Sequence, residues 1–292
     1  MAKSEVYDSR FNLLGEGPTA TGGKNELITW VDIHGKVVRW RNLLSGETGE
    51  FLTDEHVGFQ IATKSGGHIL GTVNGPILRS ADGSTKTLIT REICDGYKPQ
   101  QIVRWNDAKV GPTGDLFLGT MAYDFNPNVG AFYQMNSTGT HLRRLFGDVT
   151  ISNGMDWNVA GTLMYYADTM LKRLDVFDVV ERDIINRRTL AHFDESLGMP
   201  DGLCTDANDN IWVAFHGGGA IRCIDHTNGK IIDQVEIPCP DVTSCVFGGE
   251  NLDQMFITSY GEIADREKYP EAGMIHVALP GVRGKKTNLF GA

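Results

Sequence analysis

Short apolar runs separated by turn-forming residues recur along the whole chain. Residues 153–168, NGMDWNVAGTLMYYAD, begin with a small polar residue, continue into an apolar run, pass through a turn and end in a strongly apolar run. Residues 106–120 and 201–215 have the same layout. Windows of a dozen residues show no sustained helical period. The pattern therefore predicts an all-β protein built from short strands.

The layout repeats at a nearly constant interval. Residues 16–32 and 243–259 contain further copies, and residues 59–73 contain a less polar one. The copies start near residues 16, 59, 106, 153, 201 and 243, so the gaps range from 42 to 48 residues. Further strand-like segments lie between them, at 37–40, 131–135, 174–179, 220–225 and 274–279. A unit of about 45 residues with four short strands is typical of a propeller blade.

The repeat predicts a six-bladed β-propeller in which residues 1–292 form a single domain. An irregular β-sandwich is the alternative fold, but a sandwich does not explain such even spacing. The formal charge of −10 argues against a nucleic-acid partner, because binding to phosphates depends on Lys and Arg.

The sequence shows no targeting signal for a compartment outside the cytoplasm. Its first residues, MAKSEVYDSR, lack the apolar core of a signal peptide, and no stretch reaches membrane-spanning length. We therefore expect a cytoplasmic protein without a membrane partner, as a monomer or weak homo-oligomer. Five cysteines lack metal-site spacing such as C-x-x-C, and we expect free thiols in a reducing compartment: Cys94, Cys204, Cys223, Cys239 and Cys245.

Polar residues stand at equivalent starts of four repeats. They are Glu16, Asn106, Asn153 and Asp201. In a propeller the innermost strands converge on one channel, so these side chains should face each other. Neighbouring buried carboxylates are costly, and a bound cation would remove that cost.

Glu16, Asn153 and Asp201 would supply only oxygen ligands to such a cation. Hard oxygen ligands suit Ca²⁺, Mg²⁺ or Mn²⁺, whereas Zn²⁺ more often binds His or Cys. The eight histidines show no H-x-H or H-x-x-x-H pairing. One divalent cation is therefore expected, with calcium, magnesium, manganese and zinc as the candidates. Three protein ligands would leave coordination positions open for water and substrate.

An open cation polarises a carbonyl oxygen and acidifies bound water. Asp201 is the candidate general base for that water, which would attack an ester-like carbonyl. Arg104 and Asn106, two residues apart on one strand, should point the same way and could hold the hydroxyls of a polyol. Asp124, after the next strand, could accept hydrogen bonds from the same substrate.

Each of these residues also has an ordinary structural explanation. Asp and Asn are common in turns, and Arg104 could pair with Asp107 on the surface. Their joint placement at equivalent repeat starts favours a site. Trp30, Trp157 and Trp212 are expected to pack between strands and not to bind ligands.

Short motifs along residues 11–280 resemble the SMP-30/gluconolactonase family. The motifs are GEGP, RWND-K, GTMA, ISNGMDW, PDGL and TSCVFGG, in this order. The resemblance implies a six-bladed propeller with one divalent cation in its channel, which hydrolyses sugar lactones such as gluconolactone. It implies that Glu16, Asn153 and Asp201 bind the metal, and that Asp201 also transfers the proton.

The same resemblance implies that Arg104 and Asn106 hold the substrate. Asp124 stands where animal members of the family carry Glu, which shortens one substrate contact by a methylene. Ala108 replaces the glycine of the usual N-D-G-K motif, so that turn loses backbone freedom.

We therefore expect a metal-dependent lactonase that opens a five- or six-membered sugar lactone to its aldonic acid. Two alternatives are a calcium-binding regulator without catalysis and a propeller hydrolase acting on aryl esters or phosphotriesters. The polar wall of Arg104 and Asn106 argues against the latter, since those substrates prefer an apolar pocket.

Overall fold

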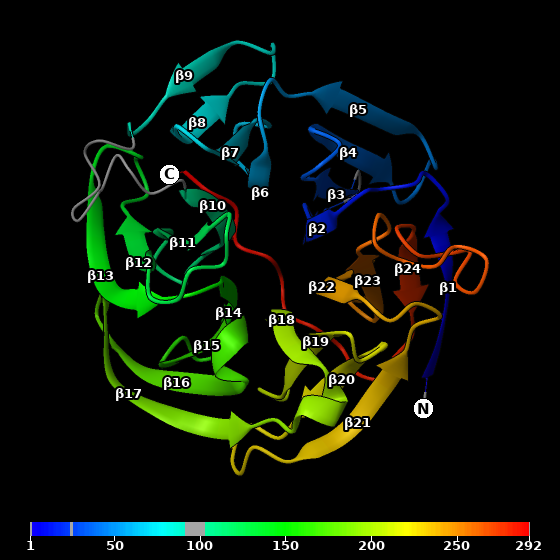
Figure 1. Ribbon diagram of the computed structural model, residues 1–292. Coiled ribbons are helices and arrows are strands. Elements are labelled where there is room, and N and C mark those ends of the chain that lie inside the picture. The colour runs from blue at the N-terminus through cyan, green and yellow to red at the C-terminus, as the bar shows by residue number, and fades with distance from the viewer. Residues whose placement is uncertain (1, 24–25, 91–102, 292) are drawn as a thin grey trace.

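The strands form sheets arranged in a ring, as Figure 1 shows. The computed structural model describes residues 2–23, 26–90 and 103–291. Four sheets have four strands each, and a fifth has eight. Strands dominate these residues, and the short helices η2 (Thr169–Leu171) and η3 (Glu195–Leu197) are single 3₁₀ turns. The prediction of an all-β protein is confirmed.

Each four-stranded sheet is an antiparallel meander in chain order. The first consists of β2 (Gly15–Ala20), β3 (Leu27–Asp32), β4 (Val37–Asn42) and β5 (Thr48–Leu52). The second consists of β6 (Val57–Ala62), β7 (His68–Thr72), β8 (Gly75–Arg79) and β9 (Thr85–Thr87). The third consists of β10 (Val103–Val110), β11 (Leu116–Ala122), β12 (Gly130–Met135) and β13 (Leu142–Val149). The fourth consists of β14 (Ser152–Trp157), β15 (Leu163–Asp168), β16 (Arg173–Val180) and β17 (Asp183–His192).

The eight-stranded sheet joins two four-stranded groups through the N-terminal strand. One group consists of β18 (Met199–Thr205), β19 (Ile211–His216), β20 (Ala220–Ile224) and β21 (Ile231–Glu236). The other consists of β22 (Val242–Gly248), β23 (Gln254–Ser259), β24 (Ile275–Ala278) and β1 (Ala2–Asp8). Strand β1 pairs antiparallel with β24 and parallel with β21. The first strand of the chain thereby completes the last group and closes the ring.

The strands nearest the centre of the ring are β2, β6, β10, β14, β18 and β22 (Figure 1). They begin at residues 15, 57, 103, 152, 199 and 242, within a few residues of the repeat starts found in the sequence. Strand β14 is buried along its whole length, whereas β5 and β17, at the outer edge, alternate or are largely exposed. Strand β14 is therefore covered on both faces, although it carries the polar residues Ser152, Asn153 and Asp156.

Aromatic side chains fill the spaces between neighbouring sheets. Trp30, Trp157 and Trp212 are at most 1% exposed, which confirms their predicted packing role. The ring of Trp157 lies edge-on to that of Phe117 on β11, with centroids 4.9 Å apart. Such aromatic pairs add to the free energy gained from burial alone.

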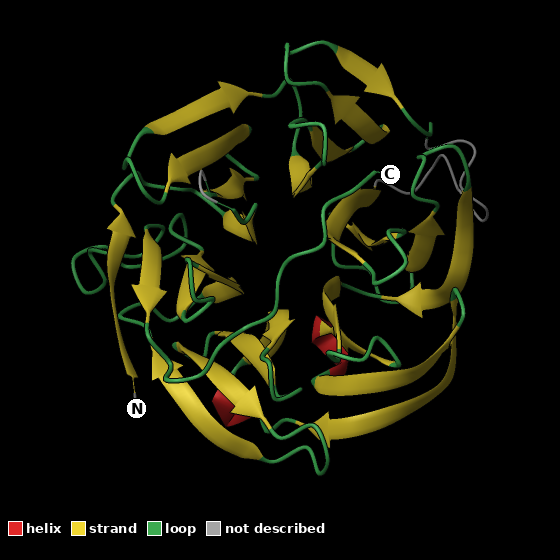
Figure 2. Cartoon of the chain, turned by 180° about the vertical axis from the view of Figure 1, so that it is seen from behind, coloured by secondary structure: helices red, strands yellow, loops and turns green. Residues whose placement is uncertain are grey.

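The C-terminal segment, residues 283–290, crosses the ring and is called the C-terminal strap here; Figure 2 shows it from behind. The backbone N–H of Gly284 donates to Leu252 O (2.7 Å), and that of Phe290 donates to Ala62 O (3.0 Å). Between them, Lys285 pairs with Asp156 near the end of β14. The strap therefore ties together the ends of strands from opposite sides of the ring, whereas the predicted site residues lie near the strand starts.

Candidate metal and substrate site

Each innermost strand that carries a predicted site residue breaks its regular pairing at that residue. Register shifts lie between residues 16 and 19 on β2, 105 and 108 on β10, 152 and 155 on β14, and 200 and 203 on β18. A bulge of this kind re-aims side chains and is common beside active sites. The bulges explain why polar residues and Gly stand at the starts of buried strands.

The glycines after Asn153 and Asp201 let neighbouring strands approach closely. A Cβ on Gly154 would lie 2.6 Å from the backbone N of Leu203, and a Cβ on Gly202 would lie 2.1 Å from Ser244 Oγ. Any larger residue would force β14 away from β18, or β18 from β22. The Asn-Gly and Asp-Gly pairs therefore narrow the centre of the ring and bring their polar side chains together.

Arg104, Asn106 and Asn153 form one hydrogen-bonded network. A guanidinium N–H of Arg104 donates to Asn106 Oδ1. Asn106 Nδ2 donates to Asn153 Oδ1 (3.0 Å) and to Ser152 O (2.8 Å). Asn153 Nδ2 donates to Thr169 Oγ1 (2.7 Å), and all of these side chains are buried. The network fixes the amide of Asn153 with its oxygen directed toward Asn106.

Glu16 and Asp201 are carboxyl groups whose surroundings disfavour a negative charge. Burial, together with Asp107, raises the pKa of Glu16 to about 8, against the effect of Arg104. Burial, Glu16 and Asp107 raise the pKa of Asp201 well above its ordinary value. Asp201 Oδ1 is buried and has no hydrogen-bond partner among the described residues. A positively charged ligand would offset the burial of these carboxyl groups beyond what Arg104 supplies.

The donor set fits a hard cation by its chemistry. Two carboxylates and an amide oxygen are oxygen ligands, and an unpartnered buried oxygen on Asp201 is the kind of atom that a cation satisfies. In the part of the chain that the structure describes, no group of three or more His, Cys, Asp and Glu residues is arranged to hold a metal ion. The predicted ligand set contains two acidic residues, Glu16 and Asp201, and its third ligand is the amide oxygen of Asn153.

Asp107 lies close to the site. From the sequence, Asp107 is expected only as a possible ion-pair partner of Arg104 on the surface. The register shift in β10 interrupts strand alternation at this residue, which lies near enough to Glu16 and Asp201 to raise the pKa of both. Burial raises the pKa of Asp107 itself to about 6, against the effect of Lys109. A bulge that the sequence does not reveal therefore adds a third acidic group.

Asp124 lies apart from this network. Its side chain is exposed, and its carboxylate accepts hydrogen bonds from the backbone N–H (3.2 Å) and Nδ2 (2.7 Å) of Asn126. The preceding residue, Tyr123, is the one that faces Arg104, whose guanidinium carbon lies 5.9 Å from the ring centroid. The substrate contact assigned to Asp124 stays a prediction.

The described cysteines are free and buried. Cys204, Cys223, Cys239 and Cys245 form no disulfide, in agreement with the expected free thiols. The Sγ atoms of Cys204 and Cys245 are 3.4 Å apart, and burial raises the pKa of Cys204 well above its ordinary value. Cys94 lies outside the described residues.

Cation binding at this site should release protons. Glu16, with a pKa raised to about 8, is largely protonated in the free protein at pH 7, whereas a cation binds its ionised form. Burial and the neighbouring carboxyl groups also raise the pKa of Asp201. We expect about one proton released per ion from Glu16 at pH 7, and an affinity that falls as the pH drops below 8. Calorimetry of Ca²⁺ or Mn²⁺ binding in buffers of different ionisation enthalpy measures this number. A binding enthalpy independent of the buffer would contradict the assignment.

Thr169 orients Asn153, and its loss should weaken cation binding. Thr169→Val removes the acceptor of Asn153 Nδ2 while keeping the side-chain volume. Removing the partner of a ligand commonly lowers metal affinity by about tenfold or more, and we expect an effect of about tenfold here. Isothermal titration with the same cation measures it, with Thr169→Ser as the control that retains the hydroxyl. Equal affinities for the Val and Ser variants would show that Thr169 does not orient the ligand.

Among the residues that the structure describes, helices long and apolar enough to span a membrane are absent.

Comparisons with known proteins agree with the fold and show the family. The model of the SMP-30/gluconolactonase/LRE-like region matches residues 14–261. Regucalcin from Danio rerio is 34% identical over 97% of this chain and 96% of its own length. Regucalcin from Homo sapiens is 33% identical over 92% of each chain.

Solved structures show the same fold. A luciferin-regenerating enzyme superposes with a TM-score of 0.90 at 26% identity, over the full length of both chains. A gluconolactonase from Xanthomonas campestris superposes with a TM-score of 0.75 at 16% identity, over 95% of this chain and 89% of its own. The family match covers most of the sequence and includes every predicted site residue. The chain belongs to the SMP-30/gluconolactonase/LRE-like family.

Proposed function

We propose that this protein is a metal-dependent lactonase that hydrolyses a sugar lactone to its aldonic acid. The observation that carries the proposal is the pair of carboxyl groups of Glu16, which is partly buried, and Asp201, which is buried, beside the hydrogen-bonded network of Arg104, Asn106 and Asn153. Hydrolysis at a carbonyl needs a proton acceptor and a positive charge at the developing oxyanion. A lactone-opening activity also suits a family that includes gluconolactonases.

We further infer that the ring is a six-bladed propeller and that residues 1–292 make up one domain. Each half of the eight-stranded sheet has the four-stranded order of the separate sheets. Strand β1 pairs with β24 within its own half and with β21, the outer strand of the other half. Counting the halves as separate blades gives each blade one innermost strand at the centre. Glu16, Arg104, Asn106, Asn153 and Asp201 then all come from innermost strands, which explains how distant residues converge.

One divalent cation would be held by Glu16, Asn153 and Asp201. Such an ion supplies polarisation of the lactone carbonyl and acidification of a water molecule. Its charge would also offset the burial and the neighbouring carboxyl groups that raise the pKa values of Glu16 and Asp201. Calcium, magnesium and manganese match the oxygen ligands best, with zinc as a further candidate.

Side chains of the protein carry out proton transfer and substrate binding. Asp201, once ionised, accepts the proton of the attacking water and returns it to the leaving hydroxyl of the opened ring. Arg104 carries a positive charge, so it can donate to the carbonyl or a ring hydroxyl. Asn106 shares its amide with Arg104 and Asn153, so substrate binding and cation binding are coupled through one side chain.

The proposal is tested with D-glucono-1,5-lactone. We expect acid release by the protein loaded with Ca²⁺, Mg²⁺, Mn²⁺ or Zn²⁺, loss of the activity on chelation, and its recovery when the ion returns. A panel of five- and six-membered lactones crossed with these ions then ranks the substrates. Turnover that is indifferent to a chelator would exclude the metal-dependent mechanism.

A second candidate function is calcium binding without catalysis. It is favoured by a solved structure of a calcium-binding protein, regucalcin, from Agrobacterium tumefaciens, which superposes with a TM-score of 0.89 at 24% identity. It predicts tight Ca²⁺ binding without lactone turnover and little loss of function in Arg104→Ala. The lactonase proposal predicts that Arg104→Ala raises KM while cation affinity stays close to that of the unmodified protein.

A further inference from the structure

Five ring-bearing side chains form a nearly continuous collar beside the site. They are Tyr123, His56, His34, Tyr260 and His216, and this set is called the collar. Successive ring centroids are 5.7, 5.5, 5.7 and 6.2 Å apart, in that order. The residues are remote in the sequence, so only the ring of sheets brings them together.

Each collar residue comes from a different neighbouring sheet or sheet half, as can be followed in Figure 1. Tyr123 follows β11, His56 precedes β6, and His34 lies in the turn after β3. Tyr260 follows β23 and bridges to Leu14, and His216 ends β19 opposite Met199. All five positions therefore lie at the end of the ring where the innermost strands begin, which is the end that carries Glu16, Asn106, Asn153 and Asp201.

Arg104 connects the collar to the site. Its guanidinium carbon lies 5.9 Å from the centroid of Tyr123, and a guanidinium N–H of the same residue donates to Asn106. Its charge also reaches His56 and Tyr260, since it affects the pKa of both. A substrate held by Arg104 and Asn106 would therefore lie next to the collar.

Two hydrogen bonds and one ion-pair contact hold the polar edges of the collar in place and leave its rings partly open. His34 Nδ1 lies 2.6 Å from Glu262 Oε2, His216 Nδ1 lies 3.3 Å from Asp241 Oδ1, and His56 Nδ1 lies 3.0 Å from the hydroxyl of Tyr123. The side chains of His34 and His216 are 31% and 25% exposed. These rings are thus fixed in position without being buried in a core.

We infer that the collar is a second subsite, which binds a sugar ring joined to the lactone. The inference rests on the proposed lactonase function. Flat aromatic and imidazole faces stack on the C–H faces of a sugar, while the edges of Tyr and His and the carboxylates of Glu262 and Asp241 accept or donate hydrogen bonds to hydroxyls. The collar also extends over four successive centroid separations of 5.5 to 6.2 Å, which leaves room for more than one ring of a substrate. The fitting substrate class is therefore a disaccharide lactone or a similarly substituted lactone.

The experiment compares cellobiono-1,5-lactone with D-glucono-1,5-lactone on the cation-loaded protein. We expect the unmodified protein to open the disaccharide lactone with a kcat/KM about tenfold higher. Tyr260→Ala, in the middle of the collar, should lower kcat/KM for the disaccharide lactone about tenfold more than for the gluconolactone. Tyr260→Phe keeps the ring and should retain most of the preference. Calorimetric binding of cellobionate, the product, should weaken in parallel.

His56→Ala provides a second collar variant if Tyr260→Ala does not fold, and His192→Ala is the matched control. His192 is an exposed histidine at the outer edge, on β17, so its loss should change neither substrate. Gluconolactone turnover without a preference for the disaccharide lactone, or equal losses for both substrates in the collar variants, would overturn the subsite alone. Turnover of neither lactone would overturn the proposed function together with the subsite.

Discussion

Asp201→Ala is expected to abolish cation binding and lactone turnover together. Asp201 is a predicted ligand and the predicted proton acceptor, and its Oδ1 has no hydrogen-bond partner in the described structure. Loss of both roles should lower kcat/KM by about 10⁴-fold or more, which steady-state assays with gluconolactone measure. Calorimetry on the same variant should show no binding of Ca²⁺ or Mn²⁺ at concentrations that saturate the unmodified protein.

Asp201→Asn separates the two roles of this residue. The amide oxygen can still act as a cation ligand, but the amide does not accept a proton at neutral pH. We expect measurable cation binding with turnover lowered by about 10²- to 10⁴-fold even at saturating cation. Asp183→Ala, on the outer strand β17, is the control and should leave both measurements unchanged, because its side chain is 59% exposed and pairs with Arg143. Near-normal rates in Asp201→Ala would show that another group is the base and ligand.

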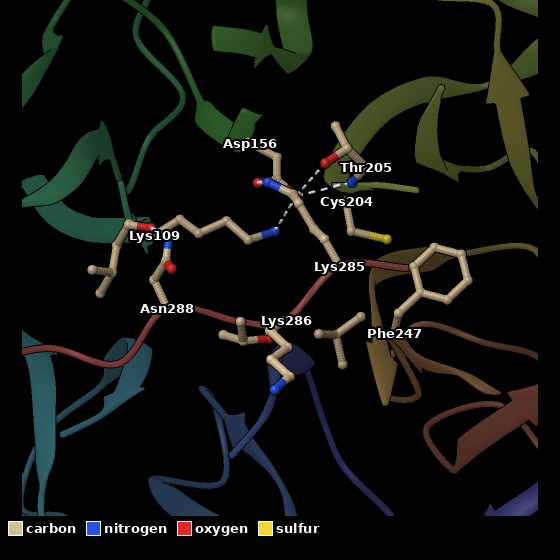
Figure 3. Close-up of a pocket in the computed structure, with 11 residues that line it drawn as sticks. Lys109, Asp156, Cys204, Thr205, Phe247, Lys285, Lys286 and Asn288 are labelled. Atoms are coloured by element: carbon tan, nitrogen blue, oxygen red, sulfur yellow. Dashed lines mark hydrogen bonds and ion pairs between the residues drawn. The ribbon is translucent and has the colours of Figure 1, made fainter. Parts of the chain in front are cut away.

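Asp156→Ala is expected to give the largest loss of stability. Asp156 is buried, and Figure 3 shows it between Lys109 and Lys285, whose Nζ atoms lie 3.1 and 2.5 Å from its carboxylate oxygens. It also accepts a hydrogen bond from the backbone N–H of Thr205 (2.9 Å). Removing the carboxylate leaves two ammonium groups without their shared partner and releases the C-terminal strap from β14. We expect a loss of about 3–5 kcal/mol in the free energy of unfolding, measured by urea denaturation.

The pH dependence tests the electrostatic origin of that loss. Burial alone would raise the pKa of Asp156, but the charges of Lys109 and Lys285 outweigh it and lower the pKa to about 2. The ordinary pKa is 3.8, so the contribution is fully present above about pH 4 and is lost as the pH falls toward 2. It amounts to about 2 kcal/mol. The stability difference between the unmodified protein and Asp156→Ala should therefore shrink by that amount between pH 5 and pH 2.

Glu50→Ala is a matched control for the Asp156 experiments. Glu50 pairs with Arg39 at 3.0 Å, but its side chain is 48% exposed. Because exposed ion pairs are screened by water, we expect a loss of less than about 1 kcal/mol. Similar losses for Glu50→Ala and Asp156→Ala would mean that burial and the strap add nothing to the Asp156 cluster.

Local sequence patterns were sufficient for the strands and for part of the site. Arg104 and Asn106 are two residues apart on one strand, and strand alternation places them on the same face, where they form a hydrogen bond. Asn153 lies within the network as expected, because its repeat start is equivalent to that of Asn106. Asp124 lies outside this network and accepts a hydrogen bond from the nearby Asn126 in a turn, and its contact with the substrate stays a prediction. Asp-x-Asn is itself a local turn signal.

Other parts of the site depend on neighbours that no local pattern reveals. Asp107 reaches the surroundings of Glu16 because of a register shift in β10, and Thr169 reaches Asn153 because a 3₁₀ turn follows β15. Lys285 stands in a segment without strand periodicity, and only the path of the strap brings it to Asp156. Each contact joins residues whose separation along the chain carries no information about their separation in space.

The sequence by itself determined that the chain forms short strands in a repeat of about 45 residues, because turn chemistry and apolar periodicity act over a few neighbouring residues. It also determined which strand starts carry carboxylate and amide groups. The tertiary structure decided which of those groups meet, because closure of the ring and the bulges of the innermost strands set their positions. It alone decided the collar and the strap, whose residues interact only after distant sheets have packed around a common centre.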